Sequence, residues 1–339
     1  MRKFISIFIV AILATISCFG QSEIDSLVQI GIQYHDNGEY KKAIEVYNEA
    51  LKIDPKSTLA NYELALTYMY SGNNENAIKH SDVVINQNED HILDAYITKG
   101  SSLSNLGKVE EALAIFNEAL EKFGENGMLC YNMGISYSKI NDSKNAELAF
   151  INAIKNKPSH ASSHISLAVI EYQQNKRVES LLSLYYFLFL EPSSKRAETA
   201  YKLLKEQLGG NAKKDKNDKN SITIFVDPKA LESEFSLAEF VLATQEALNM
   251  SKENKKKTPE ELFIETTKSF FTVLGELKEN GQKASIWWDF YVPFFYDLAK
   301  SKHIDTFCYF ISMHSNDKAL EWLKNNTKKV EEFEKWLKK

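Results

Sequence analysis

Residues 31–55 read GIQYHDNGEYKKAIEVYNEALKIDP, and this stretch predicts the fold. Gly31 and Ala43 are small, which lets two helices approach each other closely. Gly38 between them tolerates the left-handed backbone conformation that commonly ends a helix. Pro55 cannot continue a helix and so terminates the second one. The stretch therefore predicts two antiparallel helices joined by a tight turn.

The same pattern returns every 34 residues, with one slip at Ile92. The five blocks are residues 24–57, 58–91, 93–126, 127–160 and 161–194. Position 8 is small in every block, as Gly31, Ala65, Gly100, Gly134 and Ala168. Position 15 holds a glycine or asparagine, as Gly38, Gly72, Gly107, Asn141 and Asn175. A fixed period of this length is typical of a helical solenoid, in which each unit buries its apolar face against its neighbours.

This pattern resembles the tetratricopeptide repeat, and the resemblance covers about half of the chain. The best single match runs from Gly31 through Tyr34, Tyr40 and Tyr47 to Pro55. The resemblance implies an all-α solenoid in which the first helix of each repeat lines a concave groove. It also implies that the protein is a non-enzymatic scaffold for protein–protein interaction. The fifth repeat departs from the pattern, with Glu171 at position 11 and Ser180 at position 20.

Positions 2, 5, 9 and 12 of the first helices face the groove in this family, and here most are large and apolar. They give the predicted partner-binding residues Val28, Ile32, Tyr62, Leu66, Met69, Ile97, Tyr131, Ile135, Ile165 and Val169. Relatives that grip a C-terminal carboxylate carry Lys and Asn where Val28 and Ile32 stand, so that clamp is absent. Two interpretations remain open. The groove accepts an amphipathic helix or an apolar extended peptide of a protein partner, or the chain's own residues fill it.

Beyond the repeats, residues 195–208 resemble the solvating end helix that such arrays need. Residues 209–221 contain almost no large apolar side chains, and they predict a linker. Residues 222–339 lack the period and predict a helical C-terminal domain rich in aromatic residues, with one short strand near its start. A carbohydrate-binding module or an uncharacterised enzyme in residues 222–339, with the repeats as an adaptor, is the alternative function.

The second helix of repeat 5 is apolar almost all round, which is typical of a buried helix. Its outward positions predict an interdomain patch of Leu182, Tyr185, Tyr186 and Phe189, where the first repeat has Glu45, Asn48, Glu49 and Lys52. We expect the aromatic C-terminal domain to cover this patch. A partner protein is the alternative cover.

The first residues predict export. Arg2 and Lys3 precede an apolar run over residues 4–16, which is typical of a signal peptide over residues 1–20, cleaved after Gly20. The end of this segment resembles that of secreted proteins from Bacteroidota-type bacteria. The expected location is the periplasm or cell envelope, and the mature chain is expected to have no membrane span. The alternative is a lipoprotein anchored through Cys18.

Composition excludes several functions. The formal net charge of -5 argues against binding nucleic acid through a positive field.

After cleavage, Cys130 and Cys308 remain and are expected to be buried thiols. His160 and His164 have ligand-like spacing, but without a third ligand nearby they are interpreted as surface residues. We therefore expect no metal and no cofactor.

No catalytic motif appears in the sequence, and we expect no enzymatic activity. Three residues of the C-terminal third, Asp289, His303 and Asp305, are the best candidates for a polar pocket there. Trp287 and Trp288 are candidates for stacking on a sugar, with core packing as the alternative for at least one of them.

Overall fold

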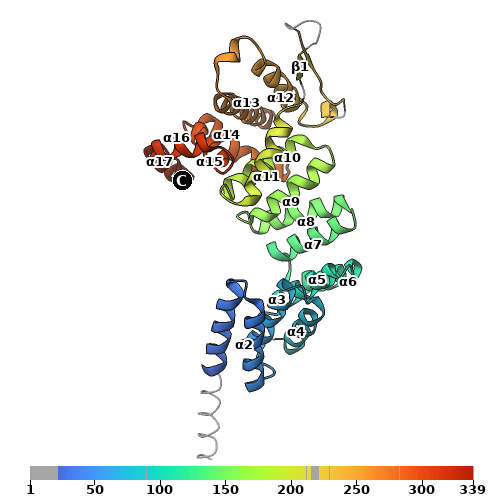
Figure 1. Cartoon of the computed structure of the whole chain (residues 1–339). Helices are drawn as coiled ribbons and strands as arrows, with labels where there is room; N and C mark the ends of the chain where they lie inside the picture. The colour runs from blue at the N-terminus through green and yellow to red at the C-terminus, as the bar shows by residue number, and fades with distance from the viewer. Residues whose placement is uncertain are drawn as a thin grey trace, which may run out of the picture. The chain divides into compact units, whose positions relative to one another are not determined.

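The computed structural model describes residues 22–88, 90–210, 212–214, 221–228, 230–281 and 283–338. The predicted signal peptide and Cys18 lie outside these residues. The chain folds into two compact units, Met1–Ala149 and Phe150–Lys339. Helices make up nearly all of the regular structure in both units (Figure 1). The predicted all-α class is confirmed.

The first unit is a series of helix pairs, in the order that the repeats predict. Residues 22–36 are helical and precede α2 (Tyr40–Ile53). They are followed by α3 (Thr58–Tyr70), α4 (Asn74–Gln87), α5 (Ile92–Asn105), α6 (Val109–Phe123), α7 (Gly127–Lys139) and α8 (Ser143–Asn156). The last turns of α8 belong to the second unit.

Backbone conformation explains the residue at position 15. Gly38, Gly72 and Gly107 have φ angles of 75°, 86° and 78°, and Asn141 and Asn175 have φ angles of 59° and 60°. Glycine and asparagine tolerate this left-handed conformation better than other residues do. Each first helix therefore ends where the sequence predicts.

Close packing explains the glycine at position 8. A Cβ atom on Gly31 would lie 2.3 Å from Cε1 of Tyr47, and one on Gly100 would lie 2.3 Å from Cε1 of Phe116. Both rings are completely buried. The large ring at position 24 of the second helix thus occupies the space that position 8 leaves open, and this contact joins the two helices of a repeat.

The second unit begins in the last turns of α8 and continues through the fifth repeat to the end of the described chain. Its helices are α9 (Ala161–Gln173), α10 (Arg177–Leu190), α11 (Lys195–Leu208), α12 (Ser236–Asn249), α13 (Pro259–Glu279), α14 (Val292–Lys300), α15 (Ile304–Ser312), α16 (Asp317–Asn325) and α17 (Thr327–Leu337). A π-helical turn over Trp287–Tyr291 leads into α14. The short strands β1 (Ala212–Lys214) and β2 (Ile222–Ile224) pair antiparallel.

Two local features differ from the sequence-based expectation. Strand β1 lies within the stretch predicted to be a linker, where it pairs with the predicted strand at β2. The unit boundary follows Ala149, inside the repeats, and does not coincide with the predicted domain boundary at residues 209–221. Near the end of the chain, α16 and α17 are separated at Asn326, whose φ of -124° lies outside the helical range.

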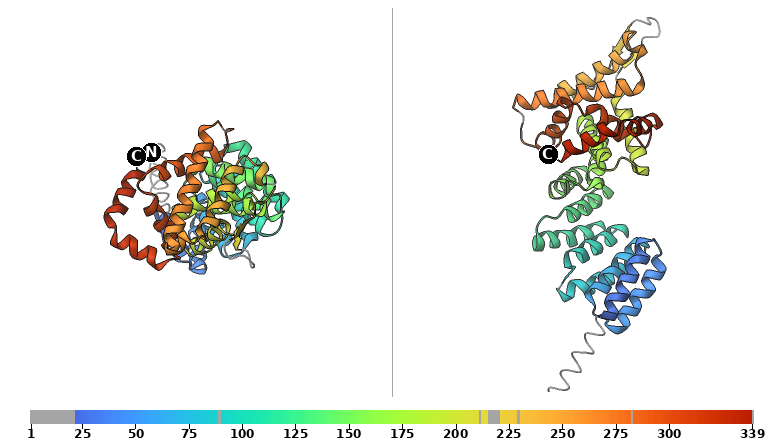
Figure 2. Two further views of the ribbon diagram at one scale, coloured as in Figure 1. Left: turned by 90° about the horizontal axis from the view of Figure 1, so that it is seen from above. Right: turned by 90° about the vertical axis from the view of Figure 1, so that its left-hand side faces the viewer.

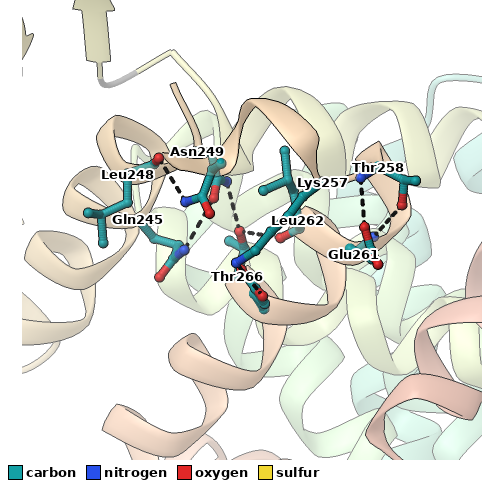
Figure 3. A network of polar contacts seen from close by, with 10 residues as sticks. Gln245, Leu248, Asn249, Lys257, Thr258, Glu261, Leu262 and Thr266 are labelled. Carbon is teal, nitrogen blue, oxygen red and sulfur yellow. Dashed lines mark hydrogen bonds and ion pairs between the residues drawn. The ribbon is translucent and has the colours of Figure 1, made fainter. Parts of the chain in front are cut away.

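The long helix α13 packs along α12 (Figure 2), and its start is capped on both sides. Thr258 Oγ1 accepts a hydrogen bond from the Glu261 backbone N–H, while Glu261 Oε2 accepts one from the Thr258 N–H (Figure 3). This capping box satisfies two backbone donors that a helix start leaves unpaired. Asn249 Nδ2 donates to Thr266 Oγ1 over 3.1 Å and ties α12 to α13.

Helix α10 lies at the centre of the second unit's core. The ring of Tyr185 is fully buried, and its centroid lies 4.9 Å from that of Phe271 on α13. Tyr186 contacts Phe294 on α14, with centroids 5.4 Å apart. Leu182 is fully buried, whereas Tyr186 and Phe189 are half-buried. Tyr185, Tyr186 and Phe189 therefore pack against helices of the C-terminal third.

Candidate functional site

The first helices of repeats 2, 3 and 4 enclose a hollow of about 290 Å³ on one face of the first unit. Its lining residues come from α3, α5 and α7, and we call this site the groove. They are Met69, Tyr70, Ser101, Ser104, Asn105, Asn132, Ile135, Ser136 and Lys139. Small and polar side chains dominate the set, so the hollow has a hydrogen-bonding floor with apolar residues beside it.

Hydrogen bonds across the groove join α5 to α7. Ser101 Oγ donates to Asn132 Oδ1 over 3.0 Å, and Asn132 Nδ2 donates to the carbonyl of Met128 over 2.8 Å. Ser136 Oγ lies 3.0 Å from Ser104 Oγ. These bonds hold the Asn132 amide in one orientation. The floor of the groove is thus preorganised by contacts between neighbouring repeats.

Lys139 extends from α7 to α5. Its Nζ donates to the Ser104 carbonyl over 2.9 Å and to Asn105 Oδ1 over 3.0 Å. Asn105 Nδ2 donates to Asn74 Oδ1 over 3.4 Å. Burial lowers the pKa of Lys139. The groove residues offer hydroxyl, amide and ammonium groups, which can form hydrogen bonds to a ligand.

Two of the predicted groove residues, Met69 and Ile135, line the groove. Tyr62 is half-buried, and its ring stacks on that of His91 with centroids 4.8 Å apart. Four other predicted residues of the first unit are half-buried on the first helices. They are Ile32, Leu66, Ile97 and Tyr131.

The prediction that Val28 lines the groove is wrong. Val28 is fully buried in a core cluster with Ala43 and Tyr47 of α2, because its side chain packs against the second helix of the repeat. Val28 therefore does not line an accessible surface. Ile165 is half-buried and Val169 is 38% exposed, but both lie on α9 in the second unit.

Sequence reasoning missed Tyr70, Asn105 and Lys139. Each stands at position 13 of its repeat, one helical turn beyond position 9 and so on the same helix face. When the repeats are aligned, position 13 reads Tyr70, Asn105 and Lys139, and this position could have indicated them as groove residues. The expected apolar groove is therefore corrected at its centre, where hydroxyl, amide and ammonium groups lie beside Met69 and Ile135.

His160 and His164, at the junction of the fourth and fifth repeats, have separate partners. His164 is completely buried, which corrects its interpretation as a surface residue. Its Nε2 donates to the Pro158 carbonyl over 2.9 Å, so Nδ1 accepts from the hydroxyl of Tyr291 over 2.7 Å. His160 contacts Ser163 Oγ. In the described part of the chain, no group of three or more His, Cys, Asp or Glu residues is arranged to hold a metal ion.

The polar candidates of the C-terminal third have separate surroundings. Asp289 is exposed, with Oδ1 4.0 Å from Lys278 Nζ. His303 is buried beside the rings of Phe333 and Trp336. Asp305 is exposed on α15.

Both candidate sugar-stacking residues, Trp287 and Trp288, are buried. Trp288 Nε1 donates to Glu234 Oε2 over 2.7 Å, and its ring stacks on Phe235. Core packing is therefore the role of both tryptophans. Cys130 and Cys308 are free and buried, as predicted.

Family models for the TPR repeat match residues 31–72, and models for the tetratricopeptide repeat match residues 93–121 and 131–186. The repeats are tetratricopeptide repeats. The groove thus lies on first helices of consecutive tetratricopeptide repeats.

Known proteins are similar over part of the chain. A TPR repeat-containing protein of Methanocaldococcus jannaschii is 26% identical over 157 residues, which are 44% of this chain and 27% of that protein. A BBSome complex member of Bos taurus is 28% identical over 116 residues, or 34% of this chain and 22% of that protein. The chain spans about a quarter of the length of these curated relatives.

Among solved structures, a thermophilic TPR protein of Thermus thermophilus superposes with a TM-score of 0.48 at 19% identity. The match covers 55% of this chain and 98% of that one. Across the residues that the structure describes, no helix combines the length and apolar character needed to span a membrane.

Proposed function

We propose that the protein is a non-enzymatic scaffold whose tetratricopeptide repeats bind an extended segment of a protein partner in the groove. The observation that carries this proposal is the preorganised floor of Ser101, Asn105 and Asn132, which offers amide and hydroxyl groups to a ligand. Met69 and Ile135 supply apolar contact beside them.

The polar floor favours an extended peptide over a helix. A helix satisfies its backbone N–H and C=O groups internally, whereas an extended segment needs partners for them outside itself. Asparagine carries both a donor and an acceptor and can pair with such a backbone. The groove therefore suits main-chain recognition, with side-chain preference set by the apolar neighbours.

We expect the double variant Asn105→Ala, Asn132→Ala to bind peptide ligands of the groove at least tenfold more weakly. A hydrogen bond contributes about 1 kcal/mol to the binding free energy, so the loss of two raises the dissociation constant more than tenfold. Peptides selected from a random display library on the purified chain serve as probes, and fluorescence anisotropy gives their dissociation constants.

The matched control is Asn117→Ala, at an exposed asparagine of the second helix α6. Far-ultraviolet circular dichroism checks that all variants remain helical. If the selected peptides bind the double variant as tightly as the unchanged chain, the groove is not their site. A preference for peptides that are helical when bound would instead support the amphipathic-helix interpretation.

We further propose that the scaffold works in the cell envelope after export. The basic residues Arg2 and Lys3 followed by the apolar run over residues 4–16 support this proposal. We expect the intact mass of the native mature protein to begin at Gln21 or its cyclised form. A lipid mass on Cys18 would contradict cleavage after Gly20 and support the anchored form.

A further inference from the structure

Helix α12 has an apolar side that the described residues of the chain leave open. Leu237, Phe240 and Leu248 are 47%, 50% and 52% exposed, whereas Ala238 and Leu242 are fully buried. Phe240 and Leu248 stand about one and three helical turns beyond Leu237, so all three residues lie on one side of the helix. We call Leu237, Phe240 and Leu248 the α12 stripe.

The hairpin of β1 and β2 packs beside α12 and extends this apolar surface (Figure 1). Ile224 and Phe225 at the end of β2 are both exposed. Lys213 of β1 holds its Nζ 5.6 Å from the centre of the Phe225 ring, so an ammonium group lies beside an exposed aromatic ring. A large exposed apolar patch is typical of a surface that binds a protein or a membrane.

Basic residues gather at the C-terminal end of the stripe. The segment over residues 251–257 contains one carboxylate, on Glu253, and four exposed lysines, which are Lys252, Lys255, Lys256 and Lys257. Asn254 Nδ2 donates to the Leu248 carbonyl over 2.9 Å and holds this segment against the end of α12 (Figure 3). The lysines therefore follow directly on the exposed side chain of Leu248.

Most of these lysines are available to a ligand. Lys257 forms an ion pair with Glu265, with Nζ 2.6 Å from Oε1. The ammonium groups of Lys252, Lys255 and Lys256 are exposed and form no ion pair with a carboxylate in the part of the chain that the structure describes. This end of the second unit therefore presents uncompensated positive charge, although the whole chain is acidic.

The carboxylates of α12 do not face the same way as the stripe. Glu239 pairs with Arg177 Nη1 over 3.2 Å, and Glu246 Oε1 accepts from the Gly210 N–H over 2.8 Å. Each carboxylate stands two residues from a member of the stripe and so lies on the other side of the helix. The stripe side of α12 is therefore apolar along its length, with positive charge at its end.

We propose that the α12 stripe and the following lysines bind the surface of an anionic lipid bilayer. Leu237, Phe240 and Leu248 enter the boundary between headgroups and acyl chains, while Lys255 and Lys256 face the phosphates. The positive charge selects a negatively charged surface. The convex side of a single helix suits a fluid surface, which needs no complementary groove. Peptide binding by the repeats is independent of this contact.

Co-flotation with lipid vesicles tests the proposal. The chain used begins at Gln21, because the apolar run over residues 4–16 binds lipid by itself, and this chain retains every described residue. We expect at least tenfold tighter binding to vesicles of equimolar phosphatidylcholine and phosphatidylglycerol than to phosphatidylcholine alone, since each lysine near an anionic surface adds attraction. Added salt should reduce this difference by screening. Equal binding to both kinds of vesicle would overturn the proposal.

An apolar double variant identifies the stripe. Phe240→Ser with Leu248→Ser should weaken binding to the anionic vesicles at least tenfold, because less apolar surface enters the bilayer. Both side chains are exposed, so circular dichroism should remain helical. Leu148→Ser, at a leucine of α8 that is also 52% exposed, is the matched control and should bind as the unchanged chain does. Undiminished binding by the double variant would contradict the proposal.

A second double variant tests the charge. Lys255→Gln with Lys256→Gln should weaken binding to the anionic vesicles at least fivefold and leave binding to phosphatidylcholine unchanged. Lys155→Gln with Lys157→Gln, at two exposed lysines, is the matched control. Light scattering distinguishes a second copy of the chain as the occupant. A dimer that Phe240→Ser with Leu248→Ser makes monomeric, together with no vesicle binding, would overturn the proposal.

Discussion

Replacing Tyr185 by Ala is expected to destabilise the second unit by about 3–5 kcal/mol, the range for removing a large buried aromatic side chain. The Tyr185 ring is fully buried between α13, α14 and α15. Its centroid lies 4.9 Å from that of Phe271, 6.0 Å from that of Phe295 and 6.3 Å from that of Phe307. Its loss leaves a cavity where repeat 5 meets the C-terminal third.

The natural tryptophans allow this effect to be measured in the full chain. Trp287, Trp288, Trp322 and Trp336 all lie in the second unit, so tryptophan fluorescence in a urea titration follows the unfolding of that unit alone. Tyr185→Phe keeps the ring and removes only the hydroxyl, which lies 2.8 Å from Thr267 Oγ1. We expect this variant to lose about 1 kcal/mol.

The matched control is Tyr172→Ala, at a tyrosine of α9 that is 44% exposed. Surface substitutions usually change the free energy of unfolding by less than about 0.5 kcal/mol. Similar losses for Tyr185→Ala and Tyr172→Ala would show that the aromatic contacts of α10 do not join repeat 5 to the C-terminal third.

Acid is expected to weaken the second unit through His164. Burial lowers the pKa of His164 to about 4, while the unfolded chain has the ordinary value near 6.5. The folded state therefore favours the neutral imidazole, which donates to Pro158 and accepts from Tyr291. The contribution of His164 to the free energy of unfolding is fully present above pH 6.5. It is lost as the pH falls toward 4, because the unfolded state then binds more protons.

The size of this effect follows from the pKa difference. Between pH 7 and pH 4 it amounts to about 3 kcal/mol. Glu179 acts in the opposite direction over much of this range, since burial raises its pKa to about 7 and its folded form retains a proton. The pH dependence of the unchanged chain alone therefore does not isolate His164, and the comparison with a variant is needed.

His164→Gln provides that comparison, because an amide can donate to Pro158 and accept from Tyr291 without titrating. We expect the variant to gain about 3 kcal/mol relative to the unchanged chain as the pH falls from 7 to 4. Urea titrations followed by tryptophan fluorescence give both values. His314→Gln, at an exposed histidine of the same unit, is the control. An equal pH-dependent gain in both variants would contradict the role of His164.

Much of the fold could be predicted because its determinants are local. Gly38 and Asn141 end helices through their own backbone conformation, and the capping box of Thr258 and Glu261 forms within four consecutive residues. Position 8 needs a small residue because a ring from the same repeat fills the space beside it. Such features depend on short sequence separations and return with every repeat.

The groove could be predicted only in part. The family pattern identified the first helices and Met69, but position 5 proved to be core at Val28. The polar floor arises from side chains of successive repeats, such as Ser101 with Asn132. Each of these residues is unremarkable by itself, and only the stacking of α5 on α7 makes them one surface.

The sequence by itself determined the repeats, their turns and the order of the helices, because these follow from local propensity and a fixed period. The tertiary structure alone decided that Tyr291 reaches His164 across 127 positions of sequence. It likewise decided that Arg177, Gln207 and Glu239 meet around one cavity. These contacts join segments without a common period, and packing of their apolar faces sets the distances at which their polar groups meet.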